Sequence, residues 1–340
     1  MQYQSHRFCV APMMDWTDRH CRVFHRQLTR HAMLYTEMVT ADAIIRGDRE
    51  RLIGHDAIEH PIALQLGGAD PAKLADAARI GEERGYDEIN LNVGCPSDRV
   101  QGGNFGACLM ADPALVARAV TAMREAVDIR VTVKCRIGID DQDSEADFAN
   151  FIDTVADAGC QLFIVHARKA WLQGLSPKQN REVPPLDYDR VYRLKAARPE
   201  LTIILNGGIT TLVQGQAHLA HVDGVMLGRA AYQTPWILAS VDALFFDDPL
   251  TQSDRDAVLS AMARYADKHI ARGGRLNNVT RHMLGLYHGQ PGGRLFRRYI
   301  AEHVDNRDSA TGDVLRGAGR LVAETREAMF LRRQSLTSVE

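Results

Sequence analysis

The sequence lacks several features that mark common classes of protein. No apolar run reaches the roughly 18 residues that a membrane-spanning helix needs, and the opening "MQYQSHRFCVAPMM" has no apolar stretch of the kind that a secretory signal requires. Among 340 residues there are only six cysteines, and none forms a C-x-x-C pair, which argues against a zinc site or a thioredoxin-like centre. We therefore expect a cytoplasmic protein with reduced thiols, no metal and no membrane association.

A glycine fingerprint of the form G-x-G-x-x-G is also missing after the first apolar run, which disfavours an open, doubly wound nucleotide-binding sheet. What recurs instead is a short β-rich run followed by a helix-like segment. The runs are "FCVAPM" (8–13), "LYTEMV" (34–39), "IALQLG" (62–67), "EINLNV" (88–93), "VTVKCRIG" (131–138), "LFIVHAR" (162–168), "TIILNGG" (202–208) and "GVMLGR" (224–229). Two of the segments between them open with Asp-Pro, a helix N-cap followed by proline. Eight such units predict an α/β fold of the TIM (β/α)8 barrel type.

The repeating pattern stops at "DDPLTQSD" (247–254), and the residues beyond it have helical spacing only. We therefore predict a barrel domain at 1–246 and a C-terminal all-helical domain at 247–340. Residues 251–340 contain 15 Arg and Lys against 10 Asp and Glu, a net charge of +5, so the total of −2 leaves −7 for residues 1–250. A basic region of this kind suits a polyanionic partner, although a solvated helical face with surplus arginine explains the charge equally well.

Polar residues stand at the ends of nearly every predicted strand. They are Gln65, Asn90, Asn92, Lys134, Arg136, His166, Arg168, Asn206 and Arg229. Where two of them share a strand they are two positions apart, so both side chains lie on the same face. Structural hydrogen bonding could explain any one of them, but a set at the C-terminal ends of barrel strands indicates an active site. A long, proline-bearing segment at 169–188 follows the sixth strand, and loops of that length at this end are usually functional.

The last two strands suggest an anionic ligand. "NGG" (206–208) and "GR" (228–229) occupy the place where this fold commonly binds phosphate through backbone N–H groups. Arg229 can add a bidentate charge. Lys134 then has two possible roles, a Schiff-base nucleophile as in an aldolase or a fixed cation beside a ring that becomes anionic.

Cys95 lies in "GCPS", directly after the fourth strand. An aldolase has no need of a thiol, whereas a reductase that adds hydride to one carbon of a C=C bond needs an acid to protonate the other. An ordinary cysteine, with a pKa of about 8.5, keeps its proton at neutral pH and can serve as that acid. Asn90 and Asn92 would then face a flavin edge or a flat substrate. The alternative for Cys95 is a small buried residue at a tight turn.

These residues match a known family. The sequence resembles the tRNA-dihydrouridine synthases through "APMMDWTD" (11–18), "LNVGCPS" (91–97), Lys134, His166, "NGGI" (206–209) and "GR" (228–229). The segments "TEMVTADAIIRGD" (36–48) and "GLSPKQNREVPPLDY" (174–188) resemble the A-type bacterial subgroup, which modifies uridines 20 and 20a. The similarity extends over essentially the whole chain.

The resemblance implies an FMN-containing barrel joined to a helical tRNA-binding domain, in a protein that we expect to be monomeric. NADPH, or NADH, would reduce the flavin, hydride would pass to C6 of a D-loop uridine, and Cys95 would protonate C5. By resemblance, the FMN contacts are Pro12, Met13, Met14, Gln65, Lys134, His166, Asn206, Gly207, Gly208, Gly228 and Arg229. The expected tRNA contacts are Asn92, Lys178, Arg181, Arg294 and Arg297.

Two other functions remain possible from the residues alone. A flavin-dependent dihydropyrimidine-type oxidoreductase acting on a free small molecule would share the barrel and the phosphate site, but it would not need the arginine-bearing helical region. A non-catalytic RNA-binding protein on a decayed barrel would not need the cysteine or the flavin residues. A uridine within folded tRNA must be flipped out of its stack, and contacts elsewhere on the RNA must offset that cost.

Overall fold

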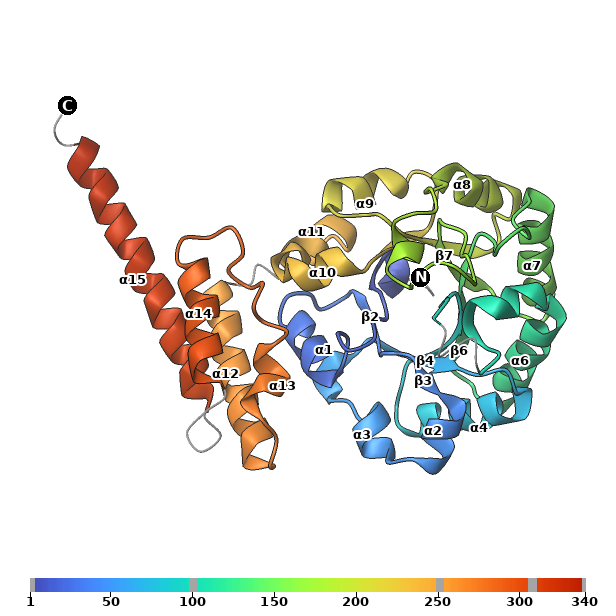
Figure 1. The fold of residues 1–340 in the computed structure, drawn as a ribbon, viewed down its shortest axis with the longest axis horizontal. Coiled ribbons are helices and arrows are strands. Elements are labelled where there is room, and N and C mark those ends of the chain that lie inside the picture. Colours follow the sequence, from blue (N-terminus) through green and yellow to red (C-terminus); the bar gives the residue numbers. More distant parts are fainter. Residues whose placement is uncertain (1–3, 98–102, 249–253, 305–310, 338–340) are drawn as a thin grey trace. The chain divides into compact units, whose positions relative to one another are not determined.

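The computed structural model describes residues 4–97, 103–248, 254–304 and 311–337 (Figure 1). Within these ranges nine parallel strands form one sheet. They are β1 (Phe8–Val10), β2 (Met33–Tyr35), β3 (Val39–Thr40), β4 (Ile62–Gly67), β5 (Glu88–Val93), β6 (Arg130–Arg136), β7 (Leu162–His166), β8 (Thr202–Asn206) and β9 (Gly224–Leu227). Strand β1 pairs with both β2 and β9, and β2 pairs with β4. These pairings close all of the strands except β3 into an eight-stranded ring. The predicted TIM barrel is confirmed.

One predicted strand is divided in two. The run at 34–39 forms β2 and the short β3, which pairs only with the end of β4. Between them the hydroxyl of Thr36 accepts the backbone N–H of Gln65 at 3.0 Å, so a side chain takes the place of a strand carbonyl. The first strand is also shorter than predicted, because it ends before Pro12, which has no N–H to donate to a neighbouring strand.

Helices alternate with the strands along the chain (Figure 1). They are α1 (Arg19–Arg26), α2 (Ala41–Arg46), α3 (Arg49–Ile53), α4 (Pro71–Glu83), α6 (Pro113–Ala126), α7 (Glu145–Asp157), α8 (Tyr188–Ala197), α9 (Leu212–His218), α10 (Arg229–Gln233) and α11 (Val241–Phe245). The two Asp-Pro starts are confirmed. The Asp70 side chain accepts the N–H groups of Ala72 and Lys73 in the first turn of α4, and the Asp112 side chain accepts that of Leu115 in α6. Proline at the first helical position loses nothing, since its N–H would have no partner there.

The interior of the barrel has an apolar part and a polar part. Residues that alternate along β1, β2, β7, β8 and β9 form a buried apolar cluster that includes Met33, Leu162, Ile164, Ile204 and Met226. Apart from Ala63, which belongs to the apolar cluster, the corresponding positions of β4, β5 and β6 carry buried polar side chains. These are Gln65, Glu88, Asn90, Asn92 and Thr132. The polar part lies in the strands that lead to Cys95.

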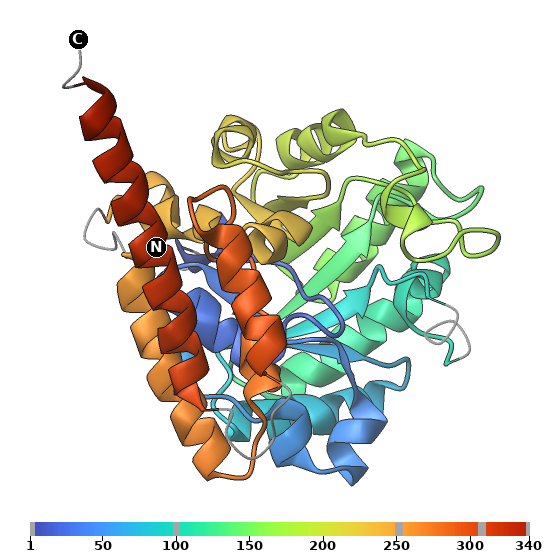
Figure 2. The ribbon, with the colours of Figure 1, turned by 60° about the vertical axis from the view of Figure 1, so that its left-hand side comes forward.

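The remainder of the described chain is helical. It contains α12 (Arg255–Ala271), α13 (Leu276–Thr280), α14 (Gly293–His303) and α15 (Gly312–Thr337). Helix α15 packs against α12 and α14 (Figure 2), and Leu315 and Val322 of α15, Met262 of α12 and Phe296 of α14 are buried. In the described residues after 254 there is no strand, and the predicted C-terminal helices are confirmed. None of the described helices combines the length and the hydrophobicity that a membrane crossing requires.

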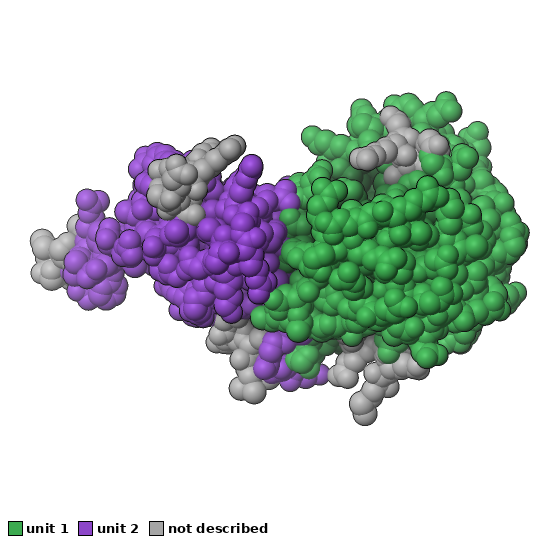
Figure 3. Space-filling model, turned by 90° about the horizontal axis from the view of Figure 1, so that it is seen from below, with its two compact units in different colours: residues 1–19, 31–229, 244–246 green, residues 20–30, 230–243, 247–340 purple. Residues whose placement is uncertain are grey.

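The chain divides into two compact units, shown in different colours in Figure 3. The first unit comprises residues 1–19, 31–229 and 244–246, and the second comprises 20–30, 230–243 and 247–340. The second unit therefore includes the segment after Arg19, where His20 Nδ1 lies 2.8 Å from the hydroxyl of Tyr265. The assignment of 1–246 to catalysis and of 247–340 to tRNA binding stays a prediction.

Candidate active site

The strand register brings the predicted site residues to one rim of the barrel. Asn92 pairs with Lys134, Arg136 with His166, and His166 with Asn206, so four consecutive strands carry these residues at or near their C-terminal ends. The Nζ atom of Lys134 donates to Oδ1 of Asn206 at 3.1 Å, across the mouth of the barrel. Period-two alternation aims the side chains of Asn92, Lys134 and Asn206 inward.

The backbone around Cys95 is held by hydrogen bonds on both sides. The N–H of Cys95 donates to Oδ1 of Asn92 at 2.9 Å, and the same oxygen accepts the N–H of Gly94 at 3.1 Å. The carbonyl of Gly94 accepts from Nε of Arg136 at 2.8 Å, and the carbonyl of Cys95 accepts from Ala107 at 2.9 Å. Both polar groups of the Gly94–Cys95 peptide are thus bonded, while the thiol itself is half-buried. The loop fixes the position of the thiol without enclosing it.

Arg136 joins this loop to the long loop at 169–188. Its side chain is buried, and Nη1 donates to the carbonyls of Lys169 and Asn180 at 3.1 and 3.0 Å. One guanidinium therefore holds three backbone carbonyls from two loops, which suits the rigid, planar arrangement of its donors. The sequence placed Arg136 at a strand end but gave no sign of this role.

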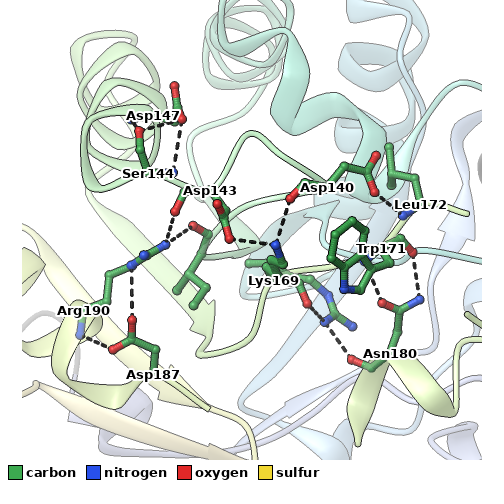
Figure 4. A network of polar contacts seen from close by, with 12 residues as sticks. Asp140, Asp143, Ser144, Asp147, Lys169, Trp171, Leu172, Asn180, Asp187 and Arg190 are labelled. Atoms are coloured by element: carbon green, nitrogen blue, oxygen red, sulfur yellow. Dashed lines mark hydrogen bonds and ion pairs between the residues drawn. The ribbon is translucent and has the colours of Figure 1, made fainter. Parts of the chain in front are cut away.

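The 169–188 loop is tied to the segment that follows β6 (Figure 4). Lys169 Nζ donates to the carbonyl of Asp140 at 3.0 Å, pairs with the carboxylate of Asp143 at 2.9 Å, and lies 4.2 Å from the centre of the Trp171 ring. The buried amide of Asn180 accepts from the N–H of Trp171 and donates to its carbonyl. These contacts make the loop an ordered part of the rim.

Two predicted tRNA contacts lie on this loop. Lys178 immediately precedes a short 3-10 turn at Gln179–Arg181, and the side chains of Lys178 and Arg181 are exposed. The neighbouring Glu182 pairs with Arg229 at 2.7 Å, with both side chains more than two-fifths exposed. Exposed ion pairs contribute little to stability, so Arg229 can exchange this partner for an anionic ligand.

The glycines after β8 occupy backbone conformations that exclude a side chain. Gly207 and Gly208 have φ angles of 112° and 71°. A Cβ atom at Gly207 would lie 2.5 Å from the ring of His166, and one at Gly208 would lie 2.5 Å from Leu186. The turn therefore requires glycine at both positions.

Gly228 differs from that pair. A Cβ atom there would lie no closer than 3.7 Å to Ala11 and to the sulfur of Met13, so the protein itself leaves room for a side chain. A glycine with free space beside it allows a ligand to approach the backbone closely. The adjacent turn after β1 is closed by hydrogen bonds between Met13 and Thr17, with Pro12 and Met13 half-buried and Met14 53% exposed.

The charges at the rim favour an anion. Burial lowers the pKa of Lys134 to about 8, and the charge of Arg136 acts in the same direction. Burial also lowers the pKa of His166 well below its ordinary value, and the nearby cations Arg136, Lys134 and Arg168 add to this effect. At neutral pH His166 is therefore a neutral imidazole beside the cationic Lys134. Among the residues that the structure describes, no three His, Cys, Asp or Glu side chains gather into a metal site.

The remaining predicted contacts, Arg294 and Arg297, lie on α14 in the second unit. Arg294 is exposed and Arg297 is half-buried. Their neighbour Arg298 pairs with Glu302 at 3.7 Å. Within the described ranges, neither Arg294 nor Arg297 has a carboxylate partner.

Comparison with known proteins identifies the family. The model for "Dihydrouridine synthase (Dus)" matches residues 9–318, which include every predicted site residue. The chain belongs to the dihydrouridine synthase family. Its members are flavin-dependent enzymes of the TIM-barrel type, so the resemblance found in the motifs and the expectation of an oxidoreductase are confirmed.

Three curated relatives of this chain carry the name tRNA-dihydrouridine(20/20a) synthase. The protein of Xanthomonas axonopodis pv. citri is 60% identical over 298 residues, 88% of this chain and 89% of that relative. The protein of Escherichia coli K12 is 58% identical over 323 residues, 95% of this chain and 93% of the relative. The protein of Escherichia coli O6:H1 is 57% identical over 325 residues, 95% and 98% of the two chains.

Proposed function

We propose that this protein reduces uridines 20 and 20a in the D-loop of tRNA to 5,6-dihydrouridine. The observation that carries the proposal is the thiol of Cys95, held half-exposed on the same rim as Lys134, His166 and the Gly207–Gly208 turn. The names of the curated relatives supply the substrate and its positions.

FMN is the cofactor that fits this rim. The Gly207–Gly208 turn, Gly228 and Arg229 would hold its phosphate, and Lys134 and His166 would lie beside its ring with Gln65, Asn206, Pro12, Met13 and the exposed Met14. The fit rests on the cationic rim, on the open space at Gly228 and on the glycine conformations at 207 and 208. When bound and reduced by NADPH or NADH, FMN supplies the hydride that adds to C6 of the uracil ring.

Cys95 supplies the proton for C5. Hydride at C6 and the thiol proton at C5 together add two hydrogens across the C5=C6 bond and leave a thiolate on Cys95. Because the thiol is half-exposed, with Sγ 3.5 Å from the hydroxyl of Ser97, solvent can return the proton after each turnover. Asn92 keeps one amide hydrogen beyond its bond to Gln65 and can donate it to the uracil.

The tRNA is held by cations outside the reacting centre. Lys178 and Arg181 project from the 169–188 loop, whose backbone Arg136 fixes, and Arg294 and Arg297 lie on α14. Arginine and lysine contacts to phosphate position an RNA without reading its sequence. Their binding free energy offsets the cost of flipping the uridine out of its stack.

Reduction of an unmodified tRNA transcript tests the function directly. Purified protein with FMN and NADPH should convert uridines 20 and 20a to dihydrouridine, detected by mass spectrometry of nuclease fragments. A transcript with cytidine at both positions should remain unchanged. Reduction of free pyrimidines with no reaction on tRNA would overturn the proposal and support the small-molecule oxidoreductase.

A further inference from the structure

A chain of hydrogen bonds runs through the polar part of the barrel interior. Asn92 Nδ2 donates to Gln65 Oε1 at 2.9 Å, and Gln65 Nε2 donates to Asn90 Oδ1 at 2.8 Å. Asn90 Nδ2 then donates to the hydroxyl of Thr132 at 2.8 Å, and that hydroxyl donates to Glu88 Oε1 at 2.7 Å. We call these five residues the inner polar chain.

The inner polar chain is excluded from solvent along its whole length. Asn92 is 8% exposed, and the four other side chains are 1% exposed or less. Glu88 and Asn92 are the first and fifth residues of β5, so the chain extends over about 13 Å of the strand. A buried polar group without a partner is costly, and a member of the chain that loses its partner cannot turn to water instead.

Both ends of the inner polar chain fix its direction. At the upper end, the backbone N–H groups of Gly94 and Cys95 can only donate, so Asn92 must present its oxygen to them. At the lower end, Glu88 Oε1 accepts from the hydroxyl of Thr132, and a carboxylate oxygen can only accept. The hydroxyl of Tyr35 donates to the same oxygen at 3.0 Å, in addition to that of Thr132. Burial and the charge of Glu88 raise the pKa of Tyr35 well above its ordinary value, so Tyr35 keeps its proton and stays a donor. No amide in between can rotate without losing bonds on both sides.

We propose that Thr132 and Glu88 are positioning residues for the thiol of Cys95, acting through Asn90, Gln65 and Asn92 on the two N–H groups that hold the loop. The inference rests on the proposed function, because these residues can position an acid only if Cys95 is the proton donor. In the apolar part of the same interior, the inward positions are filled by side chains such as Leu162, Ile164 and Ile204. Packing of a barrel interior therefore does not by itself require polar side chains. Polar residues occur in the strands that end beside Cys95.

The test compares three variants of the full-length, FMN-loaded protein. Thr132→Val keeps the size and branching of the side chain but removes the hydroxyl. Asn90 Nδ2 then loses its acceptor, and Glu88 Oε1 loses one of its donors. Thr132→Ser restores the hydroxyl. Tyr35→Phe is the matched control, because it removes a bond to the same oxygen of Glu88 at the same burial without interrupting the inner polar chain.

The two half-reactions are measured separately. We expect Thr132→Val to slow single-turnover oxidation of the reduced enzyme by tRNA about tenfold to a hundredfold, as small displacements of catalytic groups do. FMN content and the rate of flavin reduction by NADPH should stay within about twofold of wild type, because neither uses the acid. The solvent deuterium isotope effect on the tRNA step should rise, since a misplaced thiol slows proton transfer alone. Thr132→Ser and Tyr35→Phe should behave like wild type.

Several results would overturn the inference. A Thr132→Val enzyme with an unchanged tRNA step would do so, as would a Tyr35→Phe enzyme that is slowed equally. If Thr132→Val does not yield folded, flavin-loaded protein, Asn90→Leu interrupts the inner polar chain one bond higher and is measured in the same way. Wild-type protein that forms no dihydrouridine would instead contradict the proposed function, so the two failures are distinguishable.

Discussion

At the scale of single residues, the proposed chemistry depends on the thiol of Cys95. Replacing Cys95 with alanine should leave FMN binding and flavin reduction intact and should slow reduction of tRNA by on the order of 10²- to 10⁴-fold, because only that step needs the acid. Stopped-flow absorbance of the flavin separates the two half-reactions. Cys108→Ala is the matched control, since Cys108 is also half-buried and its thiol donates to the carbonyl of Phe105. Equal rates for Cys95→Ala and wild type would exclude Cys95 as the proton donor.

The charge of Lys134 predicts a pH dependence for FMN binding. Its lowered pKa of about 8 means that the free protein loses this cation as the pH rises through that value. The affinity for the anionic cofactor should be constant below that pH and should fall by up to roughly tenfold per pH unit above it. Fluorescence titration of FMN from well below to well above that pKa measures the change. Lys134→Met should bind FMN more weakly at neutral pH and should lose the pH dependence, whereas a retained dependence would assign the titration to another group.

At the scale of elements, Arg136 couples the Cys95 loop to the 169–188 loop. Arg136→Lys keeps the charge but cannot reproduce the planar donor set that reaches Gly94, Lys169 and Asn180. We expect kcat for tRNA reduction to fall by about tenfold to a hundredfold, while FMN binding stays unchanged. Amide hydrogen exchange in 169–182 should become faster, because two of its carbonyls lose their partner.

The control for this prediction is Arg193→Lys. Arg193 makes an exposed ion pair with Glu145 on the outside of the barrel, where a change of geometry has little effect. Unchanged hydrogen exchange in the 169–182 segment of Arg136→Lys would show that other interactions, such as that of Lys169 with Asp143, are sufficient to order it.

At the scale of the whole molecule, charge is divided unevenly, with −7 in residues 1–250 and +5 in residues 251–340. Part of that positive charge belongs to Arg294 and Arg297 on α14. Replacing both with alanine should weaken tRNA binding and reduce the slope of log K against log salt by about 0.7 to 0.9 for each phosphate that the protein no longer neutralises. NADPH oxidation with an artificial electron acceptor should not change.

Arg298→Ala is the matched control for the double variant. It removes one positive charge from the same helix, as either single replacement does, at a residue that already pairs with Glu302. Filter binding over a series of salt concentrations distinguishes the cases. If Arg298→Ala lowers the slope as much as either Arg294→Ala or Arg297→Ala, the effect is one of general charge and not of specific phosphate binding.

The sequence predicted the barrel because eight β-rich runs alternate with helix-like segments, two of which open with Asp-Pro. It could not predict the break between β2 and β3, since the hydroxyl of Thr36 competes there with a strand carbonyl for the N–H of Gln65. Family motifs pointed to Cys95 and to the Gly207–Gly208 turn. Arg136 and Glu88 were not predicted to act on the Cys95 loop, because their partners are carbonyls and side chains on other strands, which only the folded register brings together.

The closure of the barrel between β1 and β9 has a consequence during synthesis. Cys9 pairs with Met226, so the first strand leaves the ribosome long before its second neighbour exists. Until then β1 exposes an unpaired edge, while β4, β5 and β6 can already pair with one another. Until β9 is made, a sheet formed from the earlier strands is open, with β1 and β8 as its two edges. Val10 pairs with Leu227, so the ring can close only after residue 227 has emerged.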